Sequence, residues 1–305
     1  MPQDEAQSEL MAIDGLQSDD HRDLLNIIDS LRAQGVSQYV ELPQIIVCGD
    51  QSAGKSSVLE AISGMSFPTK DNLCTRFATE LILRRNVDKA VSITIIPGPD
   101  RSQDDKKRFS KFTCDLNQQA LAKVDNLGPS QPHLTLVDLP GLFNAANSEQ
   151  SKADAAMVQD IICNYMKRER SIIVDPNGER TIDIITKPDT LDAGSDSEFS
   201  DFKLAENKDV KFRLGWHVLK NRDYKMRSAS SEMRDLAEEQ FFSSRIWASM
   251  DRSQLGVASL RPRLSNILKE HILHQLPSLF RDISPGIDDG NTRLSRLGQA
   301  RTDAS

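Results

Sequence analysis

The chain has 305 residues, of which 38% are hydrophobic and 27% are charged, and its formal net charge is −7. This composition describes an ordinary globular protein with room for one large domain or two small ones. General nucleic-acid binders and anionic-membrane binders need clustered positive charge, so the acidic balance argues against both classes. We therefore expect neither nucleic acid nor a directly bound membrane among the partners.

The cysteine spacing and the lengths of the apolar runs indicate the cellular compartment, which we predict to be the cytoplasm. The cysteines at positions 48, 74, 114 and 163 form no CxxC pair, which fits a reducing environment. No apolar run reaches the roughly 18 residues of a membrane span, and the acidic N-terminus lacks the order of a signal peptide. The sequence predicts a cytoplasmic protein that is peripheral at organelle membranes only through partners.

The first predicted element is an amphipathic helix that follows Asp19 and ends before Gly35. Its apolar stripe consists of Leu24, Leu25, Ile28 and Leu31. Much later in the chain, Leu260, Leu264, Leu268 and Ile272 recur every four residues and predict a second amphipathic helix. We expect the two stripes to pack together, outside the domain that the segments between them form.

Residues 49–56 read GDQSAGKS and match the phosphate-loop pattern GxxxxGK[ST]. The apolar run 45–48 precedes them and a helical pattern follows, so the order is strand, loop, helix. Backbone N–H groups and the positive end of the helix then form an anion-binding concavity. Lys55 would place its charge near the β and γ phosphates, and the Ser56 hydroxyl would take a coordination position on Mg²⁺.

Residues 67–76 form a polar segment without periodicity. It lies where the first switch segment of a GTPase would be. Thr69, Thr75 and Thr79 each offer a hydroxyl to Mg²⁺, and their spacing alone does not choose among them. Two strands are predicted next, at 81–83 and 91–95. Residues 99–132 read as charged and irregular, so we expect no strand there.

Residues 134–141 read LTLVDLPG, an apolar strand with Asp138 at its end and Gly141 just beyond it. An aspartate at a strand end beside a phosphate loop can hold Mg²⁺, and a glycine there lets its N–H approach the γ phosphate. The tetrapeptide DxxG is common at turns, so it is a strong signal only as a partner to GDQSAGKS.

Residues 181–185 read as a strand, and the TKPD that follows, Thr186 to Asp189, resembles the guanine-reading pattern [NT]KxD. The Asp189 carboxylate can accept both the ring N–H and the exocyclic amine of guanine, a donor pair that adenine lacks. A helix is predicted at 153–166 and a short strand at 216–220. Asn221 and Arg222 come next as a candidate second base-side loop.

Five segments together resemble the dynamin superfamily, close to its fungal Mx-like members, over roughly residues 12 to 300. They are GDQSAGKSS, NLCTRFATE, DLPG, ITKPDTLD and LRPRLSNILKEHILHQLP. The resemblance implies an α/β fold, a P-loop GTPase domain of three layers with a mixed, mostly parallel sheet, plus flanking helical bundle segments. It divides the chain into an N-terminal tail and bundle helix (1–36), the GTPase domain (37–250) and a C-terminal bundle helix with a stub of stalk (251–305).

The resemblance also implies GTP and Mg²⁺ as cofactors and assigns roles to individual residues. Gln51, Ser52, Lys55 and Thr75 are catalytic, the first two by positioning the attacking water. The metal ligands are Ser56, Thr75 and Asp138. The nucleotide contacts are Gly49, Asp50, Ala53, Gly54, Ser56, Ser57, Gly141, Thr186, Lys187, Asp189, Asn221 and Arg222.

The family activity is hydrolysis of GTP to GDP and phosphate in membrane remodelling and fission, at mitochondria, peroxisomes or vesicles. Implied partners are a second GTPase domain, docked across the nucleotide faces, and full-length dynamin-like proteins. Microtubule or membrane association rests on family analogy alone. The stalk of the family would begin where this sequence stops, so we expect no membrane tubulation by this polypeptide alone.

The predicted strand at 171–174 is separated from the strand at 181 by only six residues, too few for the crossover between parallel neighbours. We expect one of two outcomes: antiparallel pairing of 171–174 with 181–185, or loss of 171–174 from the sheet. Either would leave a marginal nucleotide domain. Two functions therefore compete, an active GTP hydrolase and a binding-only or defective GTPase fragment that acts as an interaction module.

Overall fold

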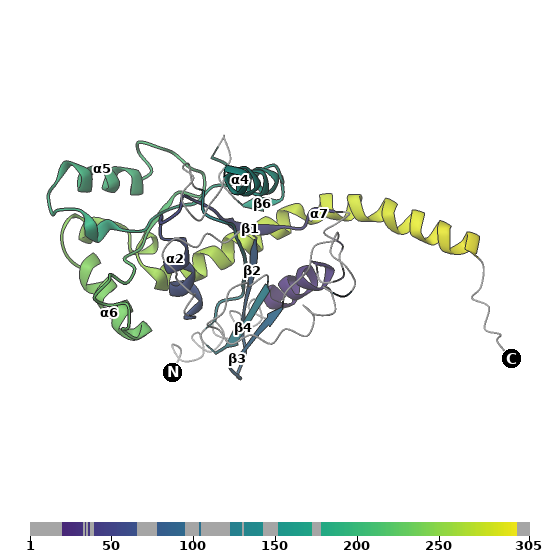
Figure 1. Ribbon diagram of the computed structural model, residues 1–305, viewed down its shortest axis with the longest axis horizontal. Coiled ribbons are helices and arrows are strands. Elements are labelled where there is room, and N and C mark those ends of the chain that lie inside the picture. Colours follow the sequence, from purple (N-terminus) through teal and green to yellow (C-terminus); the bar gives the residue numbers. More distant parts are fainter. Residues whose placement is uncertain are drawn as a thin grey trace, which may run out of the picture.

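The computed structural model describes residues 20–32, 34, 36, 40–65, 78–94, 104, 123–129, 131–142, 152–172 and 178–297. A six-stranded sheet forms the centre, a two-stranded sheet lies beside it, and one long helix, α7, runs past both (Figure 1). The predicted fold class, an α/β domain with a mixed, mostly parallel sheet and flanking helices, is confirmed.

The central sheet has the strand order β3-β4-β2-β5-β1-β6. Its strands are β1 Gln44–Val47, β2 Thr79–Arg85, β3 Ala90–Thr94, β4 Lys123–Gly128, β5 Leu134–Asp138 and β6 Ser171–Ile172. Strand β1 runs parallel to β5 and β6, and β2 runs parallel to β4, whereas the β2–β5 and β3–β4 pairs are antiparallel. Strands β1 and β5 are almost continuously apolar because helices cover both of their faces.

Successive residues of β1 point to opposite faces of the sheet. Ile45 packs in a cluster with Leu59 of helix α2 (Lys55–Ser63), and Ile46 packs in another with Ile162 of helix α4 (Lys152–Met166). Helices α2 and α4 therefore cover opposite faces. The phosphate loop, which joins β1 directly to α2, is held between these two packed layers.

Strand β4 corrects the expectation that residues 99–132 hold no strand. It pairs with both β2 and β3, and its inward positions include Val124 and Asn126, which are buried. Asn126 donates its side-chain amide to the Ser63 carbonyl at 3.0 Å. A polar residue thus occupies an inward position and satisfies its hydrogen bond locally, which hides the alternation that marks a strand.

Both outcomes expected for residues 171–174 are wrong at the residues described, since β6 stays in the central sheet beside β1. Ser171 is fully buried, and its hydroxyl accepts a 3.1 Å hydrogen bond from the Gln44 amide. Arg180 donates to the Arg168 and Ser171 carbonyls, both at 2.8 Å, and so holds the returning chain close to β6. The shortened connection separates β7 from the central sheet instead of displacing β6. Residues 173–177 lie outside the described part of the chain.

The second sheet pairs β7 (Asp183–Ile185) in parallel with β8 (Trp216–Val218). Helices α5 (Asp196–Ala205) and α6 (Ser231–Phe242) cover it, together with the short 3₁₀ helices η2 (Pro188–Thr190), η3 (Ile246–Ser249) and η4 (Arg252–Gln254). Its own core contains Val218, Phe242 and Trp247, all nearly or fully buried. The smaller sheet therefore has a core of its own, while Leu219, Ile182 and Ile184 pack into the main core.

An apolar cavity of about 190 Å³ lies where the two sheets meet. Ile45, Val47 and Ile172 line it from the central sheet, and Ile182 and Ile184 line it from the other side. The cavity is partly open to the surface, so these apolar side chains lack neighbours on one side of the junction. The expectation of a marginal nucleotide domain stays a prediction.

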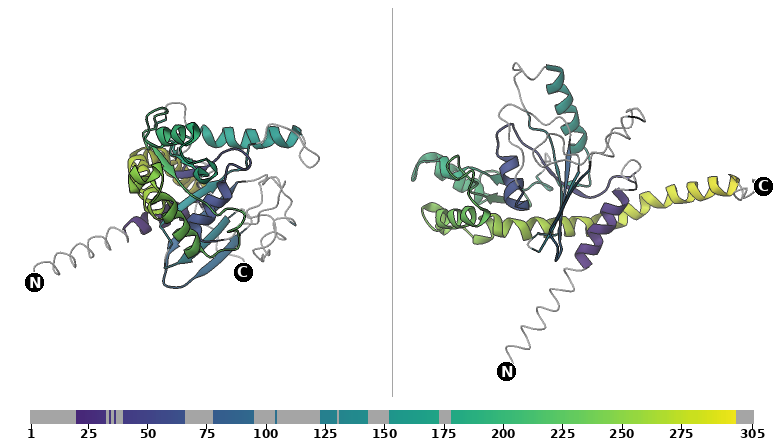
Figure 2. Two further views of the ribbon diagram at one scale, coloured as in Figure 1. Left: turned by 90° about the vertical axis from the view of Figure 1, so that its left-hand side faces the viewer. Right: turned by 60° about the horizontal axis from the view of Figure 1, so that its bottom comes forward.

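Helix α7 (Val257–Leu297) bridges the two sheets on one side and continues beyond them (Figures 1 and 2). Its predicted stripe, Leu260, Leu264, Leu268 and Ile272, is buried in the main core, and Leu25 and Ile28 of the N-terminal helix (residues 20–32) join the same cluster. Arg263 donates to the Trp216 carbonyl of β8, and Ser265 donates to the His133 carbonyl beside β5, both at 2.7 Å. No helix in the described ranges is both long and apolar enough to cross a membrane.

The buried His217 of β8 predicts an acid-sensitive fold. Its Nε2–H donates to the Gly256 carbonyl at 2.8 Å, and its Nδ1 faces Arg263 at 3.2 Å, so the ring is held neutral. Burial lowers the pKa of His217 to about 4, from 6.5. Between these values the unfolded chain takes up a proton that the folded protein excludes, so stability falls as the pH falls.

We predict that this one group removes about 2 kcal/mol from the free energy of unfolding between pH 7 and pH 5. Urea midpoints at the two pH values measure the loss. His217→Gln should reduce the pH dependence by that amount, because glutamine keeps a donor but does not titrate. The exposed His274→Gln serves as the control. An unchanged pH dependence in His217→Gln would contradict the prediction.

Candidate functional site

The phosphate loop occupies the turn between β1 and α2. Gly54 has φ +96°, in the left-handed region that favours glycine, and Ser52 adopts φ +66°. Gln51, Ser52 and Ser56 are exposed, and Ser57 is half-buried, so the loop presents hydroxyl and amide groups to solvent at the start of the helix. This is the local geometry that binds anions at helix N-termini.

Lys55 lies across the loop. Its ammonium donates to the Gly49 carbonyl at 2.8 Å and to the Asp50 carbonyl at 3.0 Å. The cation is thus held over the concavity by the backbone that surrounds it. A phosphate in this concavity would meet a charge that is already in position.

The DLPG segment is joined to the phosphate loop by backbone hydrogen bonds. The Gln51 N–H donates to the Leu142 carbonyl at 2.8 Å, and the Leu142 N–H donates to the Gly49 carbonyl at 3.2 Å. A Cβ at Gly141 would come within 3.1 Å of both the Lys55 ammonium and the Gln51 Cα. Only glycine leaves the lysine where it lies.

Asp138 ends strand β5 opposite Val47, the last residue of β1. Burial raises the pKa of Asp138 to about 7, and the positive charge of Lys55 opposes the shift. Its Oδ1 is buried and has no hydrogen-bond partner among the residues that the structure describes. A buried, unsatisfied carboxylate oxygen beside a phosphate loop fits a hard cation such as Mg²⁺, which prefers oxygen ligands.

The TKPD loop, which follows β7, lies against the phosphate loop although β7 belongs to the other sheet. The Thr186 hydroxyl donates to the Ala53 carbonyl at 2.7 Å, and the Lys187 ammonium donates to the Ser52 carbonyl at 2.8 Å. A Cβ at Gly54 would meet the Thr186 side chain at 3.1 Å. The two predicted signatures are therefore in direct contact.

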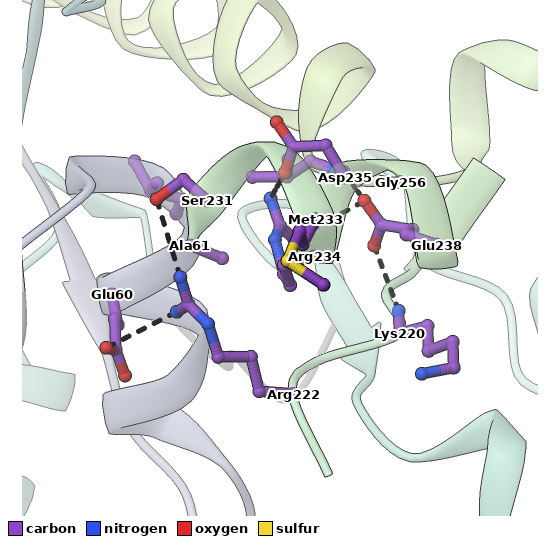
Figure 3. Close-up of polar contacts among 12 residues, drawn as sticks. Glu60, Ala61, Lys220, Arg222, Ser231, Met233, Arg234, Asp235, Glu238 and Gly256 are labelled. Atoms are coloured by element: carbon purple, nitrogen blue, oxygen red, sulfur yellow. Dashed lines mark hydrogen bonds and ion pairs between the residues drawn. The ribbon is translucent and has the colours of Figure 1, made fainter. Parts of the chain in front are cut away.

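The two base-side candidates, Asn221 and Arg222, make contacts in different places. The Asn221 amide donates to the Thr186 carbonyl at 3.2 Å, which brings Asn221 to the TKPD loop. Arg222 turns away to contact Glu60 of α2 at 3.3 Å (Figure 3). It also donates to the Ala229 carbonyl at 3.1 Å. The guanidinium thus braces the loop against α2.

One neighbour of Asp189 was not predicted from the sequence. The Lys220 ammonium lies 3.9 Å from the Asp189 carboxylate. The only sequence signal for it is its place directly before Asn221. Thr69 and Thr75, two of the three candidate switch threonines, lie outside the described residues, whereas Thr79 in β2 is described and faces Asp138 in the strand register.

A strand, phosphate loop and helix, with DxxG and TKPD loops gathered around them on a mixed sheet, define an α/β domain of the P-loop GTPase type. Residues 45–188 match the family described as Dynamin family, and residues 202–305 match its companion, the Dynamin central region. The chain belongs to the dynamin family.

Relatives in several vertebrates carry the name interferon-induced GTP-binding protein Mx. Mx2 of Canis lupus familiaris is 30% identical over 92% of this chain and 44% of its own length. Mx2 of Oncorhynchus mykiss and Mx1 of Equus caballus are each 29% identical over 91% of this chain, and over 49% and 47% of their own lengths. The chain thus spans about half the length of these Mx relatives.

The close approach at Gly141 yields a prediction. Gly141→Ala should displace Lys55 and weaken binding of a fluorescent GTP analogue by about 10- to 100-fold, the range expected when one charged hydrogen bond is lost. The matched control is Gly290→Ala on α7, where a Cβ meets nothing within 4 Å. Equal affinities of Gly141→Ala and the control would contradict the role given to this contact.

Proposed function

We propose that this chain binds GTP with Mg²⁺ in the phosphate loop and hydrolyses it to GDP and phosphate. The observation that carries the proposal is the contact of Thr186 and Lys187 with the carbonyls of Ala53 and Ser52. It sets the base-reading loop beside the phosphate-binding loop, as one nucleotide requires. The printed names of the Mx relatives, GTP-binding proteins, agree with this assignment.

The proposed division of labour follows from the chemistry of each group. The loop from Gly49 to Ser57 would bind the phosphates, with Lys55 as the charge near the β and γ phosphates. Ser56 and Asp138 would hold Mg²⁺, together with Thr75 of the switch segment. Held by these residues, the cation would supply positive charge beside the phosphates.

Selectivity for guanine would come from Asp189, with Thr186, Lys187 and Asn221 shaping the base-side loop. The neighbouring Lys220 ammonium offsets the negative charge of Asp189. An ammonium has no acceptor, so the hydrogen-bond acceptors for the base would come from Asp189. Adenine offers no pair of donors to this carboxylate, so an ATP complex would leave it unsatisfied. Arg222 would contribute indirectly, by holding this loop against α2 through its ion pair with Glu60.

Binding alone, with slow hydrolysis, is the second candidate, and the cavity favours it. The cavity extends to Gly49, Ala53 and Lys55, so one side of the phosphate loop borders open space. Catalysis needs groups held within a fraction of an ångström, whereas binding tolerates more movement. In the wider family role that we propose, membrane remodelling would require full-length dynamin-like partners or a docked second GTPase domain.

Competition between labelled GTP and unlabelled nucleotides tests the binding site. Unlabelled ATP should compete at least 100-fold less well than GTP, because a site with unpaired polar groups rejects the wrong base strongly. Lys55→Ala should weaken GTP binding by about 10- to 100-fold, and the exposed Lys211→Ala should not. Equal competition by ATP, or unchanged affinity in Lys55→Ala, would sink the assignment.

Multiple-turnover phosphate release tests hydrolysis and the proposed role of Gln51. A group that positions water acts mainly in the transition state, so Gln51→Ala should lower kcat by about 10- to 100-fold and change GTP affinity by less than threefold. Gln240→Ala, exposed on α6, is the control. Equal losses in kcat and affinity would remove Gln51 from the catalytic step, and no turnover by the unmodified protein would favour the binding-only alternative.

A further inference from the structure

A buried carboxylate on α6 connects the base-side loop to the start of α7. Glu238 is only 4% exposed. Its Oε1 accepts the Lys220 N–H at 3.0 Å (Figure 3), and its Oε2 accepts the Val257 N–H at 2.9 Å. One side chain thus satisfies two backbone donors that lie 37 positions apart in the sequence, at residues 220 and 257.

The surroundings of Glu238 are arranged for a charged group. Arg234, one helical turn earlier and equally buried, lies 3.4 Å from Oε2. A Cβ on Gly256 would come within 3.2 Å of Oε2, so the glycine leaves space for the carboxylate. Burial raises the pKa of Glu238, while the N–H donors of Val257 and Lys220 and the charge of Arg234 act in the opposite direction.

Such a group is costly for a fold that needs only stability. Desolvation of a buried ion pair commonly offsets its attraction, and well-packed apolar residues of the same volume are often equally stable or better. What the carboxylate supplies is two acceptors in fixed directions. Apolar replacements could not hold the Lys220 and Val257 amides at a defined separation.

The two amides that Glu238 holds belong to the base-side loop and to the start of α7. The Lys220 side chain lies 3.9 Å from Asp189, and the next residue, Asn221, donates to the Thr186 carbonyl at 3.2 Å. Val257 begins α7, which bridges both sheets. A shift of Lys220 would therefore move the groups that flank Asp189.

We propose that Glu238 is a positioning residue for guanine selectivity, which it secures by tying the base-side loop to the first turn of α7. The proposal rests on the proposed function, in that Asp189 must read the base. Glu238 itself does not touch the nucleotide. It acts by fixing the Lys220 backbone.

The test compares GTP with inosine triphosphate, which keeps the ring N–H and lacks the exocyclic amine that Asp189 would accept. The unmodified protein should bind GTP at least tenfold more tightly than the inosine nucleotide. Glu238→Gln keeps the shape but replaces one acceptor by an amide donor that faces a backbone N–H. In that variant the preference should shrink to less than threefold, mainly through weaker GTP binding.

The control is Glu239→Gln, the next residue on α6, whose exposed carboxylate pairs with Arg252. It should keep the full preference. A folded Glu238→Gln that weakens both nucleotides equally, and so keeps the tenfold preference, would overturn the proposal and leave Glu238 a purely structural residue. Failure of the unmodified protein to bind either nucleotide would instead overturn the proposed function itself.

Hydrogen exchange on the unmodified protein decides the question if Glu238→Gln does not fold. GTP should slow exchange at the Lys220 and Val257 amides together, by similar factors, because one carboxylate holds both. The inosine nucleotide should protect them less. Protection of the Lys220 amide alone, with the Val257 amide unchanged, would overturn the link to α7.

Discussion

Two hydrogen bonds from the TKPD loop to the phosphate loop hold the nucleotide face of this protein together. Thr186 and Lys187 come from the small sheet, and the Ala53 and Ser52 carbonyls that they reach belong to the loop of the large sheet. No strand pairing joins the two sheets in the described part of the chain. The site therefore depends on these loop contacts together with the packing of Ile184 and Leu219 against the main core.

Helix α7 also holds the two sheets together, through hydrogen bonds to both of them. Its arginines reach both units, since Arg261 donates to the Ala61 carbonyl at the end of α2 and Arg263 donates to the Trp216 carbonyl of β8. Between this helix and the loops lies the partly open cavity, which Leu264 of α7 helps to line. A nucleotide with its phosphates on Lys55 and its base on Asp189 would span the junction, and its binding free energy would add to the stability of the closed form.

The sequence allowed the prediction of features that depend on local patterns. The phosphate loop, the DLPG strand, the TKPD loop and the apolar stripe of α7 all combine a motif with the correct period. Strand β4 was missed because Asn126 occupies an inward position, where its polarity masks the alternation. The fate of β6 and β7 cannot be predicted from local patterns because it depends on two tertiary hydrogen bonds to Ser171. One comes from Gln44, 127 positions away, and the other from Arg180, at a spacing that no secondary-structure period produces.

The contacts of Glu238 show a further limit of prediction from the sequence. Nothing in the local sequence of α6 distinguishes Glu238 from its neighbour Glu239, since both are glutamates in an amphipathic helix. Only the fold separates them, by burying one against two backbone donors and leaving the other exposed. A role of this kind is a property of the three-dimensional contact and not of a motif.

The central claim, that loop contacts and a bound nucleotide would strengthen the junction between the two sheets, is tested by unfolding in urea with two probes. The only tryptophans, Trp216 and Trp247, both lie in the unit built on the small sheet, so their fluorescence reports that unit, whereas far-UV ellipticity reports the whole chain. Without nucleotide, the fluorescence transition should occur at lower urea than the ellipticity transition, and GTP with Mg²⁺ should bring the two together. Coincident transitions in the nucleotide-free protein would contradict the account.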